Sequence, residues 1–364
     1  MSAPAASAPI VAFDHVCIVF GGKPQLALPL MDQNKSREEI ETETGQVLGV
    51  HDCTLDVGEG EIVVLMGLSG SGKSTLLRAV NGLNPVVRGA VHVHDGSGLI
   101  DVVKADARTL RRLRTRRIAM VFQQFGLLPW RTVAENVGFG LELAGVPEKE
   151  RRERVAKQLT LVHLEAWAER KVHELSGGMQ QRVGLARAFA TEAPILLMDE
   201  PFSALDPLIR NRLQDELLEF QSELNRTIIF VSHDLDEALK IGSKIAIMEG
   251  GRIVQFGRPQ DIVLNPANEY VADFVAHMNP LNVLRAAEVM KPGNGQAAAA
   301  AETGIAIGDG ELCPGVAAIA GLETPLKLLL QARLATGRPI LVRDNGQIVG
   351  TIGDEEIYGS LLKR

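Results

Sequence analysis

The sequence predicts an α/β protein whose main domain is built around a largely parallel sheet. Residues 62–66 form a continuous apolar run of the kind found in strands that are buried on both faces. A glycine-rich loop and a helical pattern follow this run. Other short apolar segments alternate with helical patterns along the chain, which is typical of α/β domains. After residue 280 the composition changes, and the chain from residue 315 predicts a smaller α/β unit.

Composition and charge exclude several classes of protein. The chain has 364 residues, of which 46% are hydrophobic and 23% charged, and this is the composition of a globular protein of about two or three domains. The net charge of −7 disfavours a nucleic-acid binder that works through a positive surface field. Cys17, Cys53 and Cys313 form no CxxC pair, which excludes a disulfide framework and a cysteine-based zinc site and fits a reducing compartment. The longest apolar runs are too short to span a bilayer.

The N-terminal part begins with a segment that we expect to be a flexible tail. Residues 1–12 are rich in Ala, Ser and Pro, and no Lys or Arg precedes Lys23, so the segment lacks the basic region of a signal peptide. Residues 13–20 predict a strand. A charged, helix-like insertion at residues 24–46 then interrupts the pattern, and residues 47–57 predict the next strand.

The middle of the chain supplies the alternating strands and helices. A helix over residues 73–80 follows the glycine-rich loop. Further strands are predicted at residues 90–94, 118–122, 195–198, 227–232 and 244–248. Further helices are predicted at residues 149–161, 179–190 and 211–224. Glu249, Gly250 and Gly251 predict a hairpin turn after the last of these strands.

The C-terminal part predicts a second, smaller unit. Residues 291–310 are rich in Ala and Gly and predict a linker or loop. A helix at residues 325–336 and two strands at residues 339–343 and 347–352 follow. The Asn-Gly dipeptide at residues 345–346 predicts a hairpin between these strands, because both residues tolerate positive φ.

A phosphate-binding loop is the clearest motif in the sequence. Residues 67–75, GLSGSGKST, match the pattern GxxxxGK[ST] between a buried strand and a helix. Glycines let the backbone N–H groups face phosphates, Lys73 can reach the β- and γ-phosphates, and the Ser74 hydroxyl can bind Mg²⁺. The alternative, a Gly/Ser-rich turn before an ordinary helix, does not account for this context. We expect ATP to contact the whole loop: Gly67, Leu68, Ser69, Gly70, Ser71, Gly72, Lys73, Ser74 and Thr75.

Two acidic residues end the predicted strand at residues 195–198. A buried parallel strand would deliver Asp199 to the edge of the sheet where the phosphates bind, so that Asp199 holds Mg²⁺ directly or through water. Glu200 would then act as the general base on the attacking water. A strand that simply ends in solvated acids is the alternative, and the neighbouring phosphate loop favours the catalytic interpretation.

A third motif, LSGGMQQ at residues 175–181, resembles the LSGGQ signature of ATP-binding-cassette (ABC) ATPases, with Met179 at the usual Gln position. On physical grounds Ser176, Gly177 and Gly178 could present N–H groups and a hydroxyl to an anion, or could simply cap a helix. The resemblance implies that these residues cover the ATP held by the phosphate loop of a second subunit. It therefore implies a head-to-tail homodimer with two ATP molecules between the subunits.

The same resemblance assigns roles to four other residues. Phe20 corresponds to an aromatic residue that stacks on adenine, although a core Phe is the alternative. Gln123 corresponds to a residue that contacts Mg²⁺ and the attacking water. Asp206, in the SALD segment at residues 203–206, corresponds to a link between the two ATP sites. His233 corresponds to a γ-phosphate contact, although a lone His after a strand is more often structural.

Within the ABC family, the chain is similar to the ATPase subunits of bacterial quaternary-amine importers. The similar segments include the insertion before the phosphate loop and residues 120–145, 199–210 and 232–242. The resemblance implies an ABC nucleotide-binding domain at residues 13–280, with a helical subdomain at about residues 124–190. It also implies a CBS-like regulatory region at residues 281–364. That region has 8 Lys and Arg against 9 Asp and Glu, which gives no support for osmosensing through a basic patch.

This branch implies that ATP hydrolysis energises the import of choline, glycine betaine or proline betaine. The implied partners are transmembrane permease subunits and, through them, a periplasmic or lipid-anchored solute-binding protein. The implied location is peripheral, at the cytoplasmic face of the bacterial inner membrane, and no nucleic acid is involved. The apolar segment at residues 129–145 would offer a groove for a helix of a membrane subunit, or would take part in ordinary helix packing.

Two other functions are compatible with a phosphate loop. A soluble ABC protein of translation or DNA repair would resemble two cassettes or carry a long coiled coil, and the sequence shows neither. A P-loop kinase would have no use for the LSGGM and SALD segments. The six arginines at residues 108–117 lack interleaved aromatic residues, so we expect a solvated helix face, with a position near the membrane partner as one alternative.

Overall fold

The computed structural model describes residues 9–276, 280–293, 304–307 and 317–362. The chain divides into two compact units, residues 1–257 and residues 258–364, and each is described by itself. The composition of the sequence had placed the predicted boundary at residue 280. The difference arises because two short helices before that point, α11 (Pro259–Leu264) and α12 (Glu269–Val275), group with the second unit.

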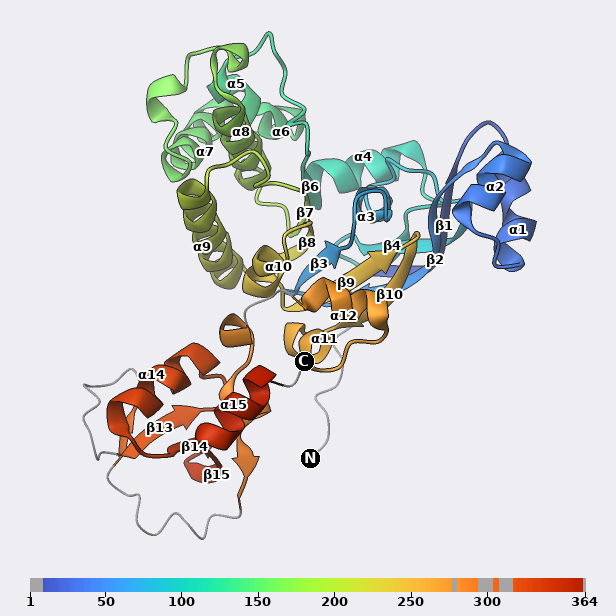
Figure 1. Cartoon of the computed structure of the whole chain (residues 1–364). Coiled ribbons are helices and arrows are strands. Elements are labelled where there is room, and N and C mark those ends of the chain that lie inside the picture. The colour runs from blue at the N-terminus through green and yellow to red at the C-terminus, as the bar shows by residue number, and fades with distance from the viewer. Residues whose placement is uncertain (1–8, 277–279, 294–303, 308–316, 363–364) are drawn as a thin grey trace. The chain divides into compact units, whose positions relative to one another are not determined.

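A six-stranded sheet with the order β10-β9-β3-β8-β7-β6 forms the centre of the first unit (Figure 1). All neighbouring strands in this sheet are parallel except β9 and β10. The strands are β3 (Ile62–Met66), β6 (Ile118–Val121), β7 (Ile195–Asp199), β8 (Thr227–Val231), β9 (Lys244–Glu249) and β10 (Arg252–Gly257). Gly250 and Gly251 have φ angles of 55° and 88°, which confirms the predicted hairpin between β9 and β10.

The N-terminal strands form a separate antiparallel sheet with the order β2-β1-β4-β5, so the expectation of one largely parallel sheet was incomplete. These strands are β1 (Val11–Phe20), β2 (Val47–Val57), β4 (Arg88–His94) and β5 (Leu99–Asp101). β1 begins inside the predicted tail, because Val11 is fully buried and pairs with Val57 and Val93. The rest of that tail, residues 1–8, lies outside the described residues.

The predicted insertion between β1 and β2 folds into short helices. They are the 3-10 helix η1 (Pro24–Ala27) and the helices α1 (Leu28–Asp32) and α2 (Arg37–Thr44). Ser36 begins α2 with a capping box, in which its side chain accepts a hydrogen bond from the backbone N–H of Glu39 while the Glu39 side chain accepts one from Ser36. Met31 and Ile40 anchor the insertion in a small apolar cluster beside β1 and β2.

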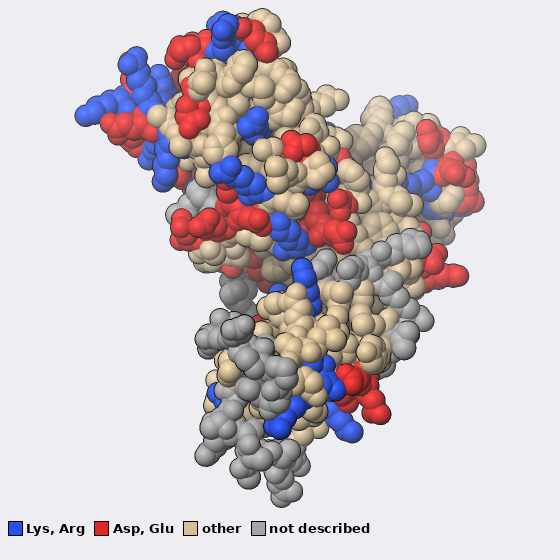
Figure 2. Space-filling view, turned by 60° about the vertical axis from the view of Figure 1, so that its left-hand side comes forward, with Lys and Arg blue, Asp and Glu red and all other residues tan. Residues whose placement is uncertain are grey.

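Four helices form a subdomain with a core of its own, which includes Val133, Leu159 and Val183. They are α5 (Val133–Val137), α6 (Phe139–Leu143), α7 (Glu148–Leu161) and α8 (Gly177–Ala190). The 3-10 helices η2 (Glu165–Trp167) and η3 (Val172–Glu174) connect α7 to α8. Figure 2 shows acidic and basic side chains interspersed over the visible face of this subdomain.

The remaining helices of the first unit follow strands of the two sheets. They are α3 (Lys73–Leu77), α4 (Ala107–Arg116), α9 (Pro207–Leu224) and α10 (Leu235–Ile241). α3 follows β3 through the glycine-rich loop, and α9 follows β7 through the segment that contains Glu200. Among the described residues, no helix has the length and apolar character that crossing a membrane requires.

The second unit contains a five-stranded sheet with the order β11-β15-β14-β13-β12. The strands are β11 (Lys291–Pro292), β12 (Gly304–Ala306), β13 (Ala317–Gly321), β14 (Ile340–Asp344) and β15 (Gln347–Ile352). Beyond α11 and α12, the helices are η4 (Pro280–Asn282), α13 (Ala286–Val289), α14 (Leu326–Thr336) and α15 (Asp354–Leu362). Asn345 and Gly346 have φ angles of 46° and 82°, which confirms the predicted hairpin. Most of the predicted linker at residues 291–310 lies outside the described residues.

Candidate active site

The loop between β3 and α3 requires glycine at two positions. Gly67 has a φ of 139°, and a Cβ atom there would lie 2.1 Å from the backbone oxygen of Met248. Gly72 has a φ of 101°, and a Cβ atom there would lie 2.6 Å from the backbone oxygen of Gly49. A side chain at either position would strain the backbone and clash with these oxygens. Glycine therefore allows the loop to pack closely over the start of α3.

Lys73, the first residue of α3, directs its side chain into the loop. Its side chain is buried, and its Nζ donates hydrogen bonds to the backbone oxygens of Gly67 at 2.8 Å and Leu68 at 2.9 Å. Burial lowers the pKa of the Lys73 ammonium, while the charges of Glu200 and Asp199 oppose this effect. The ammonium group therefore lies within the loop and close to both acidic residues.

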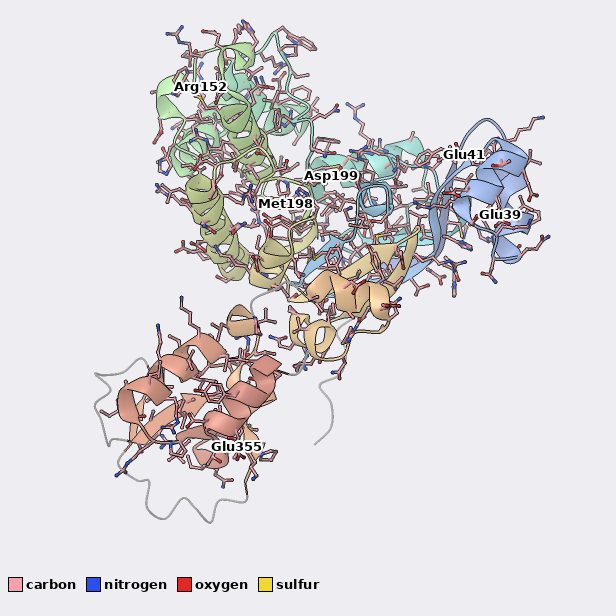
Figure 3. All side chains as sticks on the ribbon, viewed as in Figure 1. Glu39, Glu41, Arg152, Met198, Asp199 and Glu355 are labelled. Atoms are coloured by element: carbon pink, nitrogen blue, oxygen red, sulfur yellow. The ribbon has the colours of Figure 1, made fainter. Side chains whose placement is uncertain are left out.

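Asp199 ends β7 and is completely buried in the middle of the first unit (Figure 3). The Ser74 hydroxyl donates to its Oδ1 at 2.6 Å, and Arg78 donates to its Oδ2 at 2.8 Å. The structure thus brings together Ser74 and Asp199, two of the three predicted metal-binding residues. The sequence analysis missed Arg78, although Ser74 and Arg78 are four residues apart and therefore lie on one face of a helical turn.

Glu200 follows Asp199 and brings the three predicted catalytic residues together. Gln123 donates from Nε2 to Oε2 of Glu200 at 3.3 Å, and Nδ1 of His233 lies 3.3 Å from the same oxygen. Glu200 has a φ of 47°, a left-handed conformation that is uncommon for a residue with a side chain. This conformation turns the chain sharply after β7, directly beside the phosphate loop.

Gln181, a buried residue of α8, holds this turn and was not predicted. Its Nε2 donates to the backbone oxygen of Glu200 at 3.3 Å, and its Oε1 accepts a hydrogen bond from the backbone N–H of Ala204 at 3.1 Å. Because α8 begins at the LSGGM motif, Gln181 connects the signature helix to the catalytic turn of the same chain. The only sequence signal was its position inside the LSGGMQQ segment.

Arg37 is a second unpredicted residue, and it comes from the insertion. Its Nη1 donates to the backbone oxygen of Gly70 in the phosphate loop, and its Nη2 donates to the backbone oxygen of Gly49, both at 2.6 Å. Partial burial lowers the pKa of the guanidinium. The charged insertion therefore supports the loop from outside, and the charge pattern alone gave no sign of this contact.

The other predicted residues lie at the borders of the site. Phe20 is the last residue of β1, and its ring lies near Gly49 and Thr75. A Cβ atom at Gly49 would lie 2.9 Å from Cε2 of Phe20 and 3.0 Å from Cγ2 of Thr75. Ser176 caps α8, which begins with Gly177 and Gly178, and accepts a hydrogen bond from the N–H of Met179. Asp206 caps α9 in the same way. Within this chain Ser176 and Asp206 therefore act as helix caps.

The donors and acceptors of the site fit a nucleotide phosphate with a hard cation. Among the described residues of the loop, the Ser71 hydroxyl is buried and has no hydrogen-bond partner. A carboxylate, a hydroxyl and an amide oxygen from Asp199, Ser74 and Gln123 are ligands suited to Mg²⁺. The arrangement can hold phosphates beside Lys73 and offer Glu200 as a proton acceptor.

Comparisons with known proteins decide the family. A family model described as ABC transporter matches residues 50–203. The chain is 39% identical over 356 residues to the trimethylamine N-oxide transport system ATP-binding protein TmoW of Ruegeria pomeroyi, and the match covers 98% of each chain. The chain belongs to the ATP-binding subunits of ABC transporters.

Two further comparisons extend this result. The ABC ATPase is 50% identical over 273 residues to the glycine betaine/proline betaine transport system ATP-binding protein ProV of Escherichia coli K12, a match that covers 75% of this chain and 67% of ProV. A solved dimeric structure of the ATP-binding cassette MJ0796, in a post-hydrolysis state with ADP and Pi, is similar with a TM-score of 0.59 at 30% identity. The similarity covers 68% of this chain and 98% of that one. The P-loop fold and ATP hydrolysis coupled to transport, both expected from the motifs, are thereby confirmed.

Proposed function

We propose that this ABC ATPase hydrolyses ATP with Glu200 as the general base. The observation that carries the proposal is that Gln123 and His233 both contact Oε2 of Glu200. Gln123 would orient the attacking water, Glu200 would accept its proton, and His233 would contact the γ-phosphate. Lys73 would balance the charge of the β- and γ-phosphates.

Mg²⁺ fits beside the phosphates, where Ser74, Asp199 and Gln123 would hold it. The bound ion would neutralise charge that develops on the phosphates during hydrolysis. Before the ion binds, the hydrogen bonds from Ser74 and Arg78 keep the buried carboxylate of Asp199 in place. Phe20, next to Thr75, would stack on the adenine.

The working form would be a head-to-tail homodimer. Each chain carries one phosphate loop and one signature motif, so Ser176, Gly177 and Gly178 would cover the ATP bound to the partner subunit. Asp206 would link the two sites. The dimeric solved structure of MJ0796 supports this assembly, as does the position of Ser176 at a helix N-terminus, where N–H groups can bind an anion.

The imported solute would be a quaternary amine such as glycine betaine, proline betaine or choline. The support comes from relatives whose names refer to these solutes, among them ProV and the choline transport ATP-binding protein OpuBA of Bacillus subtilis. Trimethylamine N-oxide is a second candidate, because the relative that matches 98% of the chain is named for it. Both candidates carry a nitrogen with methyl substituents.

Permease subunits in the bacterial inner membrane would be the direct partners, with the ATPase bound at their cytoplasmic face. A hollow of about 320 Å³ in the first unit supports this interface. Met120, Phe122 and Phe139 line it, so it could take the apolar face of a helix from a permease. A solute-binding protein, periplasmic or lipid-anchored, would act through the permease. The C-terminal unit would be a CBS-like regulatory region.

Reconstitution tests the proposal. The full chain is combined with its permease subunits and solute-binding protein in proteoliposomes, and phosphate release is measured with glycine betaine, choline or trimethylamine N-oxide. We expect one of these methylated amines to stimulate hydrolysis, whereas a similar amino acid without N-methyl groups should not. The absence of stimulation by all three solutes in a complex that hydrolyses ATP would contradict the proposed solute class.

A further inference from the structure

The arginine-rich segment forms an amphipathic helix, α4, with a basic face. Arg108, Arg111, Arg112 and Arg116 follow the i, i+3, i+4, i+8 spacing, which places them on one side of the helix. On the opposite side, Leu113 is buried, and Leu110 packs against the core that joins the two sheets of the first unit. Packing therefore fixes α4, and its arginine face points outward. We call these four residues the arginine face.

The arginine face borders a hollow of about 430 Å³. The other lining residues are two threonines of α4 and, across the hollow, Leu143 and Ala144 at the end of α6, which is a neighbour of α4 in Figure 1. No acidic residue contributes to the lining. Leu143 is 53% exposed. The hollow thus combines a row of guanidinium groups with one exposed apolar side chain.

Most of this charge has no ion-pair partner within the described part of the chain, although the carboxylate of Asp106, which caps α4, interacts with Arg108 and Arg112 through its charge. Arg112 forms an ion pair with Asp95 at 2.6 Å, but Arg108, Arg111 and Arg116 form none with any described residue. The other arginine of α4, Arg114, turns away and donates to backbone oxygens. Like charges three and four residues apart on a helix repel one another, so a partner with carboxylates would relieve this repulsion.

The same two helices, α4 and α6, line both this hollow and the apolar one that the proposed function assigns to a permease helix. Arg114 of α4 and Phe139 and Gly140 of α6 line the apolar hollow, whereas other residues of α4 and the end of α6 line the basic one. A helix seated in the apolar hollow would therefore have its end or its flanking segment beside the arginine face.

We propose that the arginine face of α4 binds an acidic segment of the permease, next to the helix that occupies the apolar hollow. This inference rests on the proposed transport function. The ABC ATPase carries a net charge of −7, so an anionic bilayer or a nucleic acid, which presents negative charge over a wide area, would meet repulsion outside this face. A short acidic segment meets only the arginines. Its role is to set the register and affinity of the docked helix.

A triple variant, Arg108→Gln, Arg111→Gln and Arg116→Gln, tests the proposal in the full chain. The matched control, Lys149→Gln, Arg152→Gln and Lys157→Gln, removes the same formal charge from exposed positions of α7. Binding is measured to phosphatidylcholine vesicles that contain the permease, to empty phosphatidylcholine vesicles and to phosphatidylglycerol-rich vesicles without permease. The triple variant would lose three exposed charge pairs with the permease, so we expect its affinity for the permease vesicles to fall about tenfold at low salt. The control should bind like the wild type. The difference should shrink as salt rises.

A cross-linking variant identifies the partner group. Arg111→Lys keeps the charge and adds a primary amine, which a carbodiimide can join to a neighbouring carboxylate, whereas a guanidinium does not react. We expect a cross-link between residue 111 and an acidic residue of the permease that the wild type does not form, mapped by mass spectrometry.

The outcomes separate this inference from the proposed function. If the wild type does not bind permease vesicles, both fail. If the wild type binds and the triple variant binds equally well at low salt, only the role of the arginine face is refuted. If the triple variant instead loses binding to phosphatidylglycerol-rich vesicles and keeps its affinity for the permease, the surface binds lipid and the inference is wrong.

Discussion

Arg37 offers a direct test of how the insertion supports the phosphate loop. Arg37→Ala removes two hydrogen bonds of 2.6 Å, to the backbone oxygens of Gly70 and Gly49. Gly70 is exposed, so water can replace the first bond. The bond to Gly49 is partly buried, and its loss leaves a carbonyl oxygen with reduced access to a donor. The substitution therefore weakens the loop conformation that presents its N–H groups to phosphates.

The expected magnitude follows from these two contacts. A hydrogen bond from a charged donor contributes about 1.5–3 kcal/mol, and water recovers part of this at the exposed carbonyl. We therefore expect the native loop conformation to lose about 2 kcal/mol. Since 1.4 kcal/mol is tenfold in an equilibrium constant, the affinity for ATP should fall by up to about 30-fold.

Calorimetric titration of the full chain with ATP measures this effect, and thermal unfolding reports on stability. Lys35→Ala is the matched control, because Lys35 belongs to the same insertion and its ion pairs, with Glu39 and Glu43, both lie within that insertion. Each of these surface pairs contributes at most about 1 kcal/mol and neither contacts the phosphate loop, so ATP affinity should not change. Arg37→Lys keeps the charge but loses the planar guanidinium that donates to both backbone oxygens. Its ATP affinity should therefore lie between those of the wild type and Arg37→Ala. Wild-type affinity in a folded Arg37→Ala variant would refute the reasoning.

Four further changes test the site. Lys73→Ala removes the ammonium group in the loop, so ATP affinity and turnover should both fall; unchanged affinity by titration would mean that backbone N–H groups alone hold the phosphates. Glu200→Gln should slow phosphate release by about 10²–10⁴-fold and, with Mg·ATP, elute as a dimer in size-exclusion chromatography; hydrolysis at the wild-type rate would remove Glu200 from the mechanism. Gln181→Ala should lower kcat more than ATP affinity, and an unchanged kcat would show that the turn holds without it. A chain that ends at residue 280 should still bind ATP, and loss of binding in a folded truncation would contradict this.

The parallel strands could be predicted because burial on both faces leaves an uninterrupted apolar run. β3 and β2 match the predicted ranges to the residue. The division into two sheets could not be predicted, because it depends on pairings such as that of β1 with β4, which join segments far apart in the sequence. Short helices such as α5 and α6 were also missed, since five residues are too few to show a period.

The site shows the same contrast between local and distant contacts. Ser74, Asp199 and Glu200 belong to motifs whose spacing carries their chemistry, so the sequence predicted them. Arg37 and Arg78 act across 33 and 121 residues of chain, and although helical spacing places Arg78 beside Ser74, no local pattern identifies the distant group that either arginine contacts. Their common feature is that a basic side chain meets a backbone oxygen or a carboxylate that only the fold brings within reach.

The hydrogen bonds of Gln181 have a consequence for how the two ATP sites of a dimer communicate. In the proposed dimer, α8 touches the partner's ATP at its first turn and the chain's own catalytic turn at Gln181. A shift of α8 on closing over one nucleotide would therefore displace Glu200 at the other. Hydrolysis would then be cooperative, with a Hill coefficient above one for ATP, and the Gln181 amide would carry part of the coupling.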